Sequence, residues 1–370
     1  MSAVAERSSD AAPRWPGDGK DFRVTMGLHV CAPQAWLLPV AAAPDLLANK
    51  AAVLAAHHDE AFAVMAEGDA AAREAADVLF AHLENHDPDV FASVVQLSVT
   101  GADEQHPFER VGRLVAEDIC IMTPHAGSMS DNEAEYRLTA ALLCAPSRWS
   151  LREKLGTSLR SIHGPVPGYD TIAAPTDRFF ARLPVGDIME RTNWSVLDSP
   201  ELFQPGFEHA RTEVDSGSAH AAESRDSSTA ATPAIPAGAT ALAAVGPAVS
   251  AQSAEPAAPT EAAVSPQSAD LAAYSKPELS DGTTSDTAVL QRRWLRLERQ
   301  TLRKLPQSGA VIFTILTTNT RLDVLAADDP DIARQLAHKM RTAPAATCVY
   351  KGWSDASSVA DALEAACSGT

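Results

Sequence analysis

The chain has 370 residues and a net charge of −18, with 48 acidic against 30 basic residues. Such a balance argues against a protein that binds nucleic acid electrostatically, because phosphate neutralisation needs a basic face, and against attraction to anionic membranes. Five scattered cysteines without a Cys-x-x-Cys pair argue against a disulfide framework and against a zinc or iron–sulfur site of the usual spacing.

Residues 1–20 are polar and lack the apolar core of a secretory signal, so we expect a disordered N-terminal tail. No later stretch stays apolar for the length that a bilayer requires. Together these features predict a cytoplasmic protein without a membrane segment.

Residues 44–86 show helical spacing of apolar side chains, interrupted at Gly68 and Asp69. We therefore predict two helices, with Asp69 as the N-cap of the second. Residues 94–99 and 117–122 are rich in β-branched residues and are strand candidates. Residues 136–144 fit a strand or a helix equally, and the Ser150-x-x-Glu153 pattern predicts a short helix that Gly156 limits.

From about residue 211 to residue 285 the chain becomes Ala, Ser, Pro, Thr and Glu with almost no large apolar side chains. Such a segment cannot bury enough apolar surface to offset its chain entropy, so we predict a disordered, partly extended insert. Residues 286–370 are short for a core of their own. We therefore expect one domain, formed by residues 21–210 and 286–370 and interrupted by the insert.

In the second part, residues 295–299 and 311–316 predict strands, residues 330–341 a helix after Asp329, and residues 347–353 a last strand. Strands and helices do not alternate regularly along the whole chain. This order is typical of an α+β fold with an antiparallel sheet.

Most familiar catalytic signatures are missing, including Gly-x-Gly-x-x-Gly, the P-loop, His-Glu-x-x-His and Gly-x-Ser-x-Gly. Several runs are instead dense in residue types that usually carry chemistry. They are CAPSRWSLREKLG (144–156), SIHGPVPGY (161–169), DRFF (177–180), RTNWS (191–195) and ERQTLRKLP (298–306), with MGL (26–28) and Trp36 before them and YKG (350–352) after them.

In their order and composition these runs resemble the motifs of the haem-dependent oxidative N-demethylase family, known as the DUF3445 family. The resemblance extends over nearly the whole chain except the two tails and the insert, which is the main departure. It implies a PAS-like haem-binding fold and a haem-dependent monooxygenase that oxidises a small N-methylated amine with O2 and releases formaldehyde. It also implies a separate reductase subunit that carries flavin and an iron–sulfur centre and takes electrons from NADPH.

With this resemblance, His163 is the first candidate for the haem iron ligand, since a neutral imidazole nitrogen binds iron while its other N–H is held by an acceptor. The prolines and glycines after it predict a fixed, non-helical loop. A turn histidine on the surface is the alternative. His29 and His125 are weaker rivals, and the adjacent pair His57 and His58 is expected to face solvent.

Arg178, Arg299 and Arg303 are candidate partners of the haem propionates, because guanidinium groups suit carboxylates. For each of them, an ordinary structural ion pair is at least as good an interpretation.

Tyr169 and Asn193 are candidate catalytic residues that would line the substrate pocket with Trp194. An aromatic face there would stabilise an alkylammonium cation, although core packing is the better interpretation of Trp194.

Two other functions stay open. A PAS-like haem domain can act as a non-catalytic sensor, and a haem-free domain can serve as an interaction module. The sequence also leaves the oligomeric state open, a homo-oligomer included.

Overall fold

The computed structural model of the protein describes residues 11–89, 91–92, 105–125, 135–206 and 285–368. The strand predicted at 94–99 lies outside these ranges, and so does all but the last residue of the predicted insert. The described chain begins at residue 11, ten residues before the predicted domain boundary at residue 21. The described ranges on both sides of 207–284 belong to the same compact unit.

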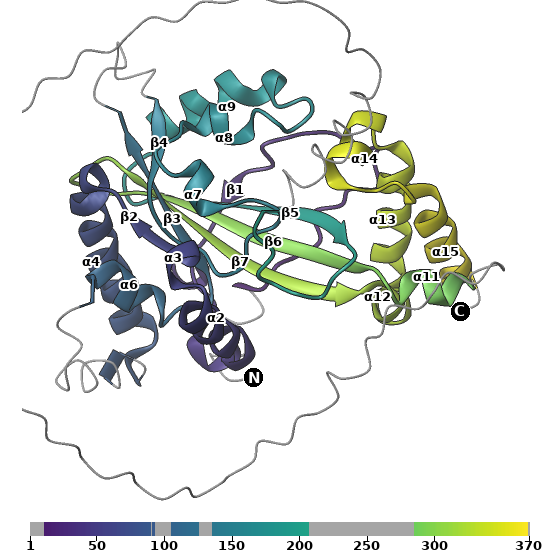
Figure 1. Cartoon of the computed structure of the whole chain (residues 1–370), viewed down its shortest axis with the longest axis horizontal. Coiled ribbons are helices and arrows are strands. Elements are labelled where there is room, and N and C mark those ends of the chain that lie inside the picture. Colours follow the sequence, from purple (N-terminus) through teal and green to yellow (C-terminus); the bar gives the residue numbers. More distant parts are fainter. Residues whose placement is uncertain (1–10, 90, 93–104, 126–134, 207–284, 369–370) are drawn as a thin grey trace, which may run out of the picture. The chain divides into compact units, whose positions relative to one another are not determined.

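A seven-stranded antiparallel sheet runs through this unit in the order β1-β5-β6-β7-β3-β4-β2 (Figure 1). The two longest strands, β6 and β7, come from the second part of the chain and lie between β5 and β3. They therefore complete a sheet that the first part begins. The strands are β1 His29–Val30, β2 Phe62–Val64, β3 Asp118–Pro124, β4 Tyr136–Leu142, β5 Ile188–Leu197, β6 Trp294–Lys304 and β7 Val311–Arg321.

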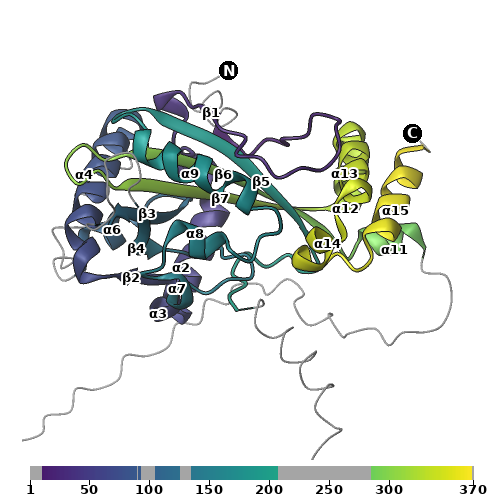
Figure 2. The same cartoon turned by 90° about the horizontal axis from the view of Figure 1, so that it is seen from above.

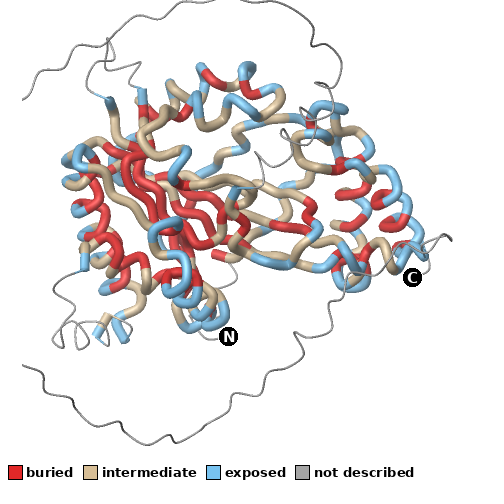
Figure 3. The backbone as a smooth tube through the Cα atoms, in the orientation of Figure 1, coloured by how far each residue is buried: buried red, intermediate tan, exposed pale blue. Residues whose placement is uncertain are grey.

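Strand β3 shows how the two faces of the sheet are covered, because successive side chains point to opposite faces. Ile119 and Ile121 pack into a core with Leu79 of α4 and with Trp36, whereas Cys120 belongs to a core with side chains of α7, α8 and α9. Helices α4 and α6 therefore cover one face, and α7 to α9 cover the other (Figures 1 and 2). Figure 3 shows the buried backbone concentrated in these central strands and in the inner faces of the helices.

The helices of the first part are short apart from α2, α4 and α9. Those of the second part, α11 to α15, pack with one another and against Val196 and Leu295 at the far end of the long strands. The bounds are α2 Pro44–Ala56, α3 His58–Ala61, α4 Asp69–His86, α6 Pro107–Gly112, α7 Leu151–Lys154, α8 Leu159–His163, α9 Asp170–Arg182, α11 Asp286–Leu290, α12 Leu322–Asp328, α13 Pro330–Thr342, α14 Ala345–Lys351 and α15 Ala356–Ser368, with 3-10 turns η1 Pro33–Ala35, η2 Val40–Ala42 and η3 Ala66–Gly68.

The predictions for β3, β6, β7 and α13 are confirmed, and residues 136–144 resolve to the strand β4. Ser150 does precede the short helix α7, but its side chain makes no capping hydrogen bond, and Gly156 after the helix has a φ of +78°. The capping-box pattern thus locates the helix without supplying the cap.

Three local predictions are wrong. Residues 347–351 belong to helix α14 and not to a strand, because Pro344 precedes the first helical turn and Gly352, with a φ of +68°, ends the helix. Within 44–86 the strand β2 and turn η3 separate the helices, since β2 pairs with β4 and leaves Phe62 extended. Asp69 is the first residue of α4 and not its N-cap, and its carboxylate pairs with Arg73 and His106.

Candidate functional site

A cavity of about 750 Å³ lies on the sheet face that carries α8 and α9. Its floor is formed by side chains of β5, β6, β7 and β3, such as Leu302, Phe313 and Met122. Helices α8 and α9 form one wall, and α14 contributes Lys351 and Tyr350 at the far end. The volume lies within the range of sites that enclose small molecules and cofactors.

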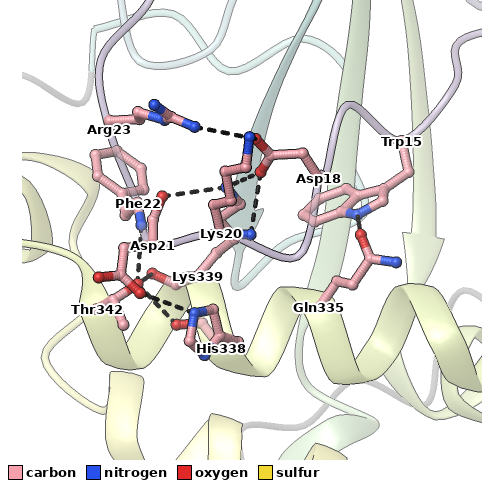
Figure 4. A network of polar contacts seen from close by, with 10 residues as sticks. All are labelled: Trp15, Asp18, Lys20, Asp21, Phe22, Arg23, Gln335, His338, Lys339 and Thr342. Atoms are coloured by element: carbon pink, nitrogen blue, oxygen red, sulfur yellow. Dashed lines mark hydrogen bonds and ion pairs between the residues drawn. The ribbon is translucent and has the colours of Figure 1, made fainter.

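The N-terminal segment, defined here as residues 11–30, contributes much of the remaining lining. Figure 4 shows it bound along α13, where the Trp15 indole N–H donates to Gln335 at 3.1 Å and the backbone N–H of Phe22 donates to Thr342. Lys339 Nζ lies 2.9 Å from a carboxylate oxygen of Asp18. This hydrogen bond is the main cause that holds the pKa of Asp18 well below its usual range. The segment thus forms a wall of the cavity and is held on α13 by polar contacts.

His163 is the C-terminal residue of α8, and its side chain lines the cavity. The predicted non-helical loop is therefore wrong at this residue, because Ser158 caps α8 and carries the helix through His163 before the glycines and prolines begin. Its Nδ1 lies 2.9 Å from the carbonyl oxygen of Leu159. A carbonyl oxygen only accepts, so Nδ1 carries the proton and Nε2 keeps its lone pair.

Burial lowers the pKa of His163, and the charges of Lys154 and Arg191 lower it further against the opposing effect of the Leu159 hydrogen bond. The ring stacks on Tyr169, with centroids 4.9 Å apart and planes inclined by 17°. A neutral imidazole with a fixed tautomer and a fixed ring plane is the form in which histidine binds a metal.

Tyr169 and Asn193 both line the cavity. The Tyr169 hydroxyl is buried and has no hydrogen bond of good geometry among the described residues. The Thr176 hydroxyl, which donates to the carbonyl of Ile172, lies close enough to oppose the rise that burial gives the pKa of Tyr169. The Asn193 amide donates to Glu298 at 3.2 Å, across the register pair that joins β5 to β6. The structure therefore brings these two predicted residues and His163 into one cavity.

The three predicted propionate partners are not gathered there. Arg178 is exposed and is not part of the cavity lining, and Arg303 lies over the Trp36 ring at 4.5 Å, toward the opposite face of the sheet. Arg299 reaches the cavity edge, but its guanidinium is used by Glu190 and by the carbonyl oxygens of Ala35 and Trp36. The geometry of Arg299 is that of a structural ion pair.

The rival histidines are placed less favourably. His29 lies at the cavity edge, where its exposed ring pairs with Glu190 at 3.0 Å, and His125 is exposed and outside the lining. His57 and His58 are both partly exposed and contact Glu60 and Glu109, respectively.

Sequence reasoning did not single out three cations of the cavity, namely Arg148, Arg191 and Lys351. Each of the three lies in one of the sequence motifs quoted above. A motif alone does not show which of its residues face the cavity, so these three could not be selected from the sequence. Glu298 lies among them and accepts hydrogen bonds from Arg296 at 3.0 Å and from the Gln300 amide at 3.0 Å. Burial alone raises the pKa of Glu298, but Arg296 and Asn193 outweigh it and the net shift is downward.

Aromatic rings close the same end of the cavity. Trp194 stacks on Trp353 with a centroid distance of 5.3 Å and contacts Trp15 at 5.2 Å. Lys351 Nζ lies over both stacked indoles, 5.6 and 5.3 Å from their centroids. Trp194 therefore packs in a core, as expected, and also contributes to the cavity wall.

Over the described ranges no helix has the length and apolar character that a membrane span needs. Within the same ranges, His, Cys, Asp and Glu side chains form no group of three or more that is placed to bind a bare metal ion.

The fold and the cavity define an α+β protein with a large, partly basic and partly aromatic pocket, in which a backbone carbonyl holds Nδ1 of His163. The family model of haem-dependent oxidative N-demethylase, alpha subunit-like proteins matches residues 27–232 and 260–360. This is well over half of the chain, and the chain therefore belongs to that family, as its motifs indicate. The unmatched residues 233–259 fall inside the predicted insert, but the model also matches residues 211–232 and 260–285, so the departure from the family is shorter than the predicted 211–285. A comparison with curated proteins gives no match.

Proposed function

We propose that this chain is the haem-binding subunit of an oxidative N-demethylase. It would oxidise the N-methyl group of a small amine with O2 and release formaldehyde and the demethylated amine. The observation that carries the proposal is His163, whose Nδ1 is held by Leu159 O at 2.9 Å while the ring lines a 750 Å³ cavity in a member of this family.

The residues of the cavity suit a haem. The lining combines apolar side chains such as Leu302 and Phe313 with aromatic rings and with basic groups, which match the hydrocarbon body and the two carboxylates of the porphyrin. Two buried polar groups, the Tyr169 hydroxyl and Arg191 Nε, have no partner in the described part of the chain. Buried polar groups are usually satisfied, so these two suit contacts with a ligand.

In this proposal His163 Nε2 holds the iron, and Leu159 O fixes the tautomer as the second-shell acceptor. When bound, the haem supplies the activation of O2. Tyr169 restrains the imidazole plane by stacking and offers its hydroxyl to the bound molecules. Asn193, whose amide N–H is committed to Glu298, offers its amide oxygen to the N–H of the amine.

The overall reaction consumes an N-methyl amine, one O2, two electrons and two protons, and it yields the demethylated amine, formaldehyde and water. The two electrons must come from outside, because no motif for a flavin, nicotinamide or iron–sulfur centre is found in this chain. We propose a partner reductase with NADPH, flavin and an iron–sulfur centre, in keeping with the family's description as an alpha subunit.

We further propose that the described unit is PAS-like and works in the cytoplasm. A separate proposal concerns residues 211–285, which we infer to be a tether that the haem domain does not need for folding. Both ends of this segment connect to the same compact unit, so its deletion with a short linker is expected to leave the sheet intact.

The test is turnover by the full chain after loading with haem and reduction by an artificial electron donor. We expect oxygen consumption that depends on an N-methyl amine and formaldehyde formed in proportion to the amine consumed. Retained haem without amine-dependent turnover across simple methylamines would favour a sensor. Failure to retain haem would favour an interaction module.

A further inference from the structure

The cavity carries a positive charge that the rest of the chain does not share. The chain has a net charge of −18, yet eight basic and only three acidic side chains line the cavity. Two of the acidic groups are matched within the lining, Asp18 by Lys339 and Glu190 by Arg299. The lining thus holds more basic than acidic side chains, and Glu298 is the third of its acidic groups.

Three of these cations converge at the α14 end. Arg148 Nη1 donates to the backbone carbonyl of Lys351, and Lys351 Nζ donates to the carbonyl of Trp194 at 2.9 Å. Arg191 lies on β5, and its Nε is buried with no hydrogen-bond partner among the described residues. An ammonium group has three donors, so Lys351 keeps capacity for a ligand after its bond to Trp194.

The loop that presents Arg148 is held in a costly conformation. Arg148 has a φ of +64°, and no other residue except glycine has a positive φ in the described ranges. Its backbone N–H donates to Gln204 O, and Gln204 in turn donates its own N–H to Pro146 O. A non-glycine residue at positive φ is uncommon, and such strain tends to occur at functional sites.

Glu298 supplies only one negative charge beside these three cations. Its carboxylate accepts from Arg296, Asn193 and Gln300, at 3.0, 3.2 and 3.0 Å. Burial is the main cause that lowers the pKa of Lys351 to about 8, and the charges of Arg148 and Arg191 lower it further, although Glu298 raises it. Without a ligand the cations repel one another, and a bound anion would relieve this repulsion.

We propose that Arg148, Arg191 and Lys351 form an anion subsite that holds the carboxylates of the cavity ligand. The subsite takes the place of the three arginines that the sequence suggested. That the carboxylates are the propionates of haem rests on the proposed function. Arg191 and His163 line the same cavity.

The test uses the full-length, haem-free chain and four ligands: haem, haem dimethyl ester, protoporphyrin IX and its dimethyl ester. The esters keep the ring but lose both negative charges. Each lost charge-assisted contact is expected to weaken binding roughly ten-fold. Wild-type protein should therefore bind each acid at least ten-fold more tightly than its ester, as followed by absorption or by quenching of tryptophan fluorescence.

Arg191→Gln and Lys351→Met should each lose roughly ten-fold in affinity for the acids and keep their affinity for the esters, so the acid-to-ester ratio should fall roughly ten-fold. Arg178→Gln is the matched control, because Arg178 is exposed and outside the lining, and its ratio should equal that of wild type. Equal binding of acid and ester by wild type, or equal losses for both in the variants, would overturn the subsite.

The metal-free porphyrins separate this proposal from the assignment of His163. His163→Ala should lose the spectrum of ligated iron but keep the preference for the acid of protoporphyrin IX. Haem ligation without that preference would leave the proposed function standing and refute the subsite. Wild-type protein that binds no porphyrin at all would contradict both.

Discussion

Replacing Arg299 by glutamine is expected to destabilise the fold and to leave cofactor affinity unchanged. The Arg299 side chain is 4% exposed and pairs with Glu190. Its guanidinium also donates to the carbonyl oxygens of Trp36 at 3.0 Å and Ala35 at 2.7 Å. It thus ties the middle of β6 to β5 and to the chain around η1.

Removing one member of a buried ion pair costs about 3–5 kcal/mol, because the other charge and its acceptors are left unsatisfied. The Glu190 side chain keeps 19% exposure and a second contact to His29, which favours the lower end of that range. We therefore expect a loss of about 3 kcal/mol for Arg299→Gln. Arg178→Gln, an exposed change on α9, should stay within about 0.5 kcal/mol of wild type.

Guanidinium chloride unfolding of both haem-free variants, followed by circular dichroism, measures the difference. A lower midpoint with an unchanged slope for Arg299→Gln is expected, since the slope reports the surface exposed on unfolding. The reasoning would be refuted if Arg299→Gln unfolded within about 1 kcal/mol of wild type and specifically lost haem affinity. Arg299 would then belong to the cofactor site.

Three further outcomes follow from the site. Tyr169→Phe removes a buried hydroxyl without a partner, so thermal unfolding of the haem-free protein should show unchanged or slightly higher stability, and a loss above about 1 kcal/mol would contradict this. Lys339→Met should speed proteolysis within residues 11–30, as mapped by mass spectrometry. The pKa of Asp18 lies below its ordinary value of 3.8, so the ion pair with Lys339 is fully formed above pH 3.8 and is lost only as the pH falls below it. Cleavage of the wild-type segment should therefore accelerate only in strong acid, and acceleration near neutral pH would contradict this expectation. Glu298→Gln should lower the pKa of Lys351 below about 8, because Glu298 raises it; NMR titration of methylated lysines measures this, and an unchanged or higher value would rule it out.

The elements that the sequence predicted well are those with long, consistent patterns. Strands β6 and β7 carry eleven residues each, and α13 begins at a proline and continues for thirteen. Short elements depend on neighbours far away in the chain. Strand β2 has three residues and exists because β4 pairs with it, and α14 is a helix although it contains Thr347 and Val349.

The motifs marked the region of the site but not its geometry, because in a strand the parity of a residue decides its face. Arg299 and Arg303 are odd-numbered like Thr301, which accepts a hydrogen bond from the Trp36 indole on the sheet face opposite the cavity. Glu298 is even-numbered and lies opposite Asn193 on β5, on the cavity face. Arg148 and Lys351 meet although 203 residues separate them. No periodicity within a single run could have predicted that contact.

The most direct measurement is the absorption spectrum of the full chain reconstituted with haem, compared between wild type, His163→Gly and His125→Ala. Wild type and His125→Ala should show the same spectrum of histidine-ligated haem, since His125 is exposed and outside the cavity. His163→Gly should lose that spectrum and recover it when imidazole is added. An unchanged spectrum in His163→Gly would contradict the central claim that His163 holds the haem iron.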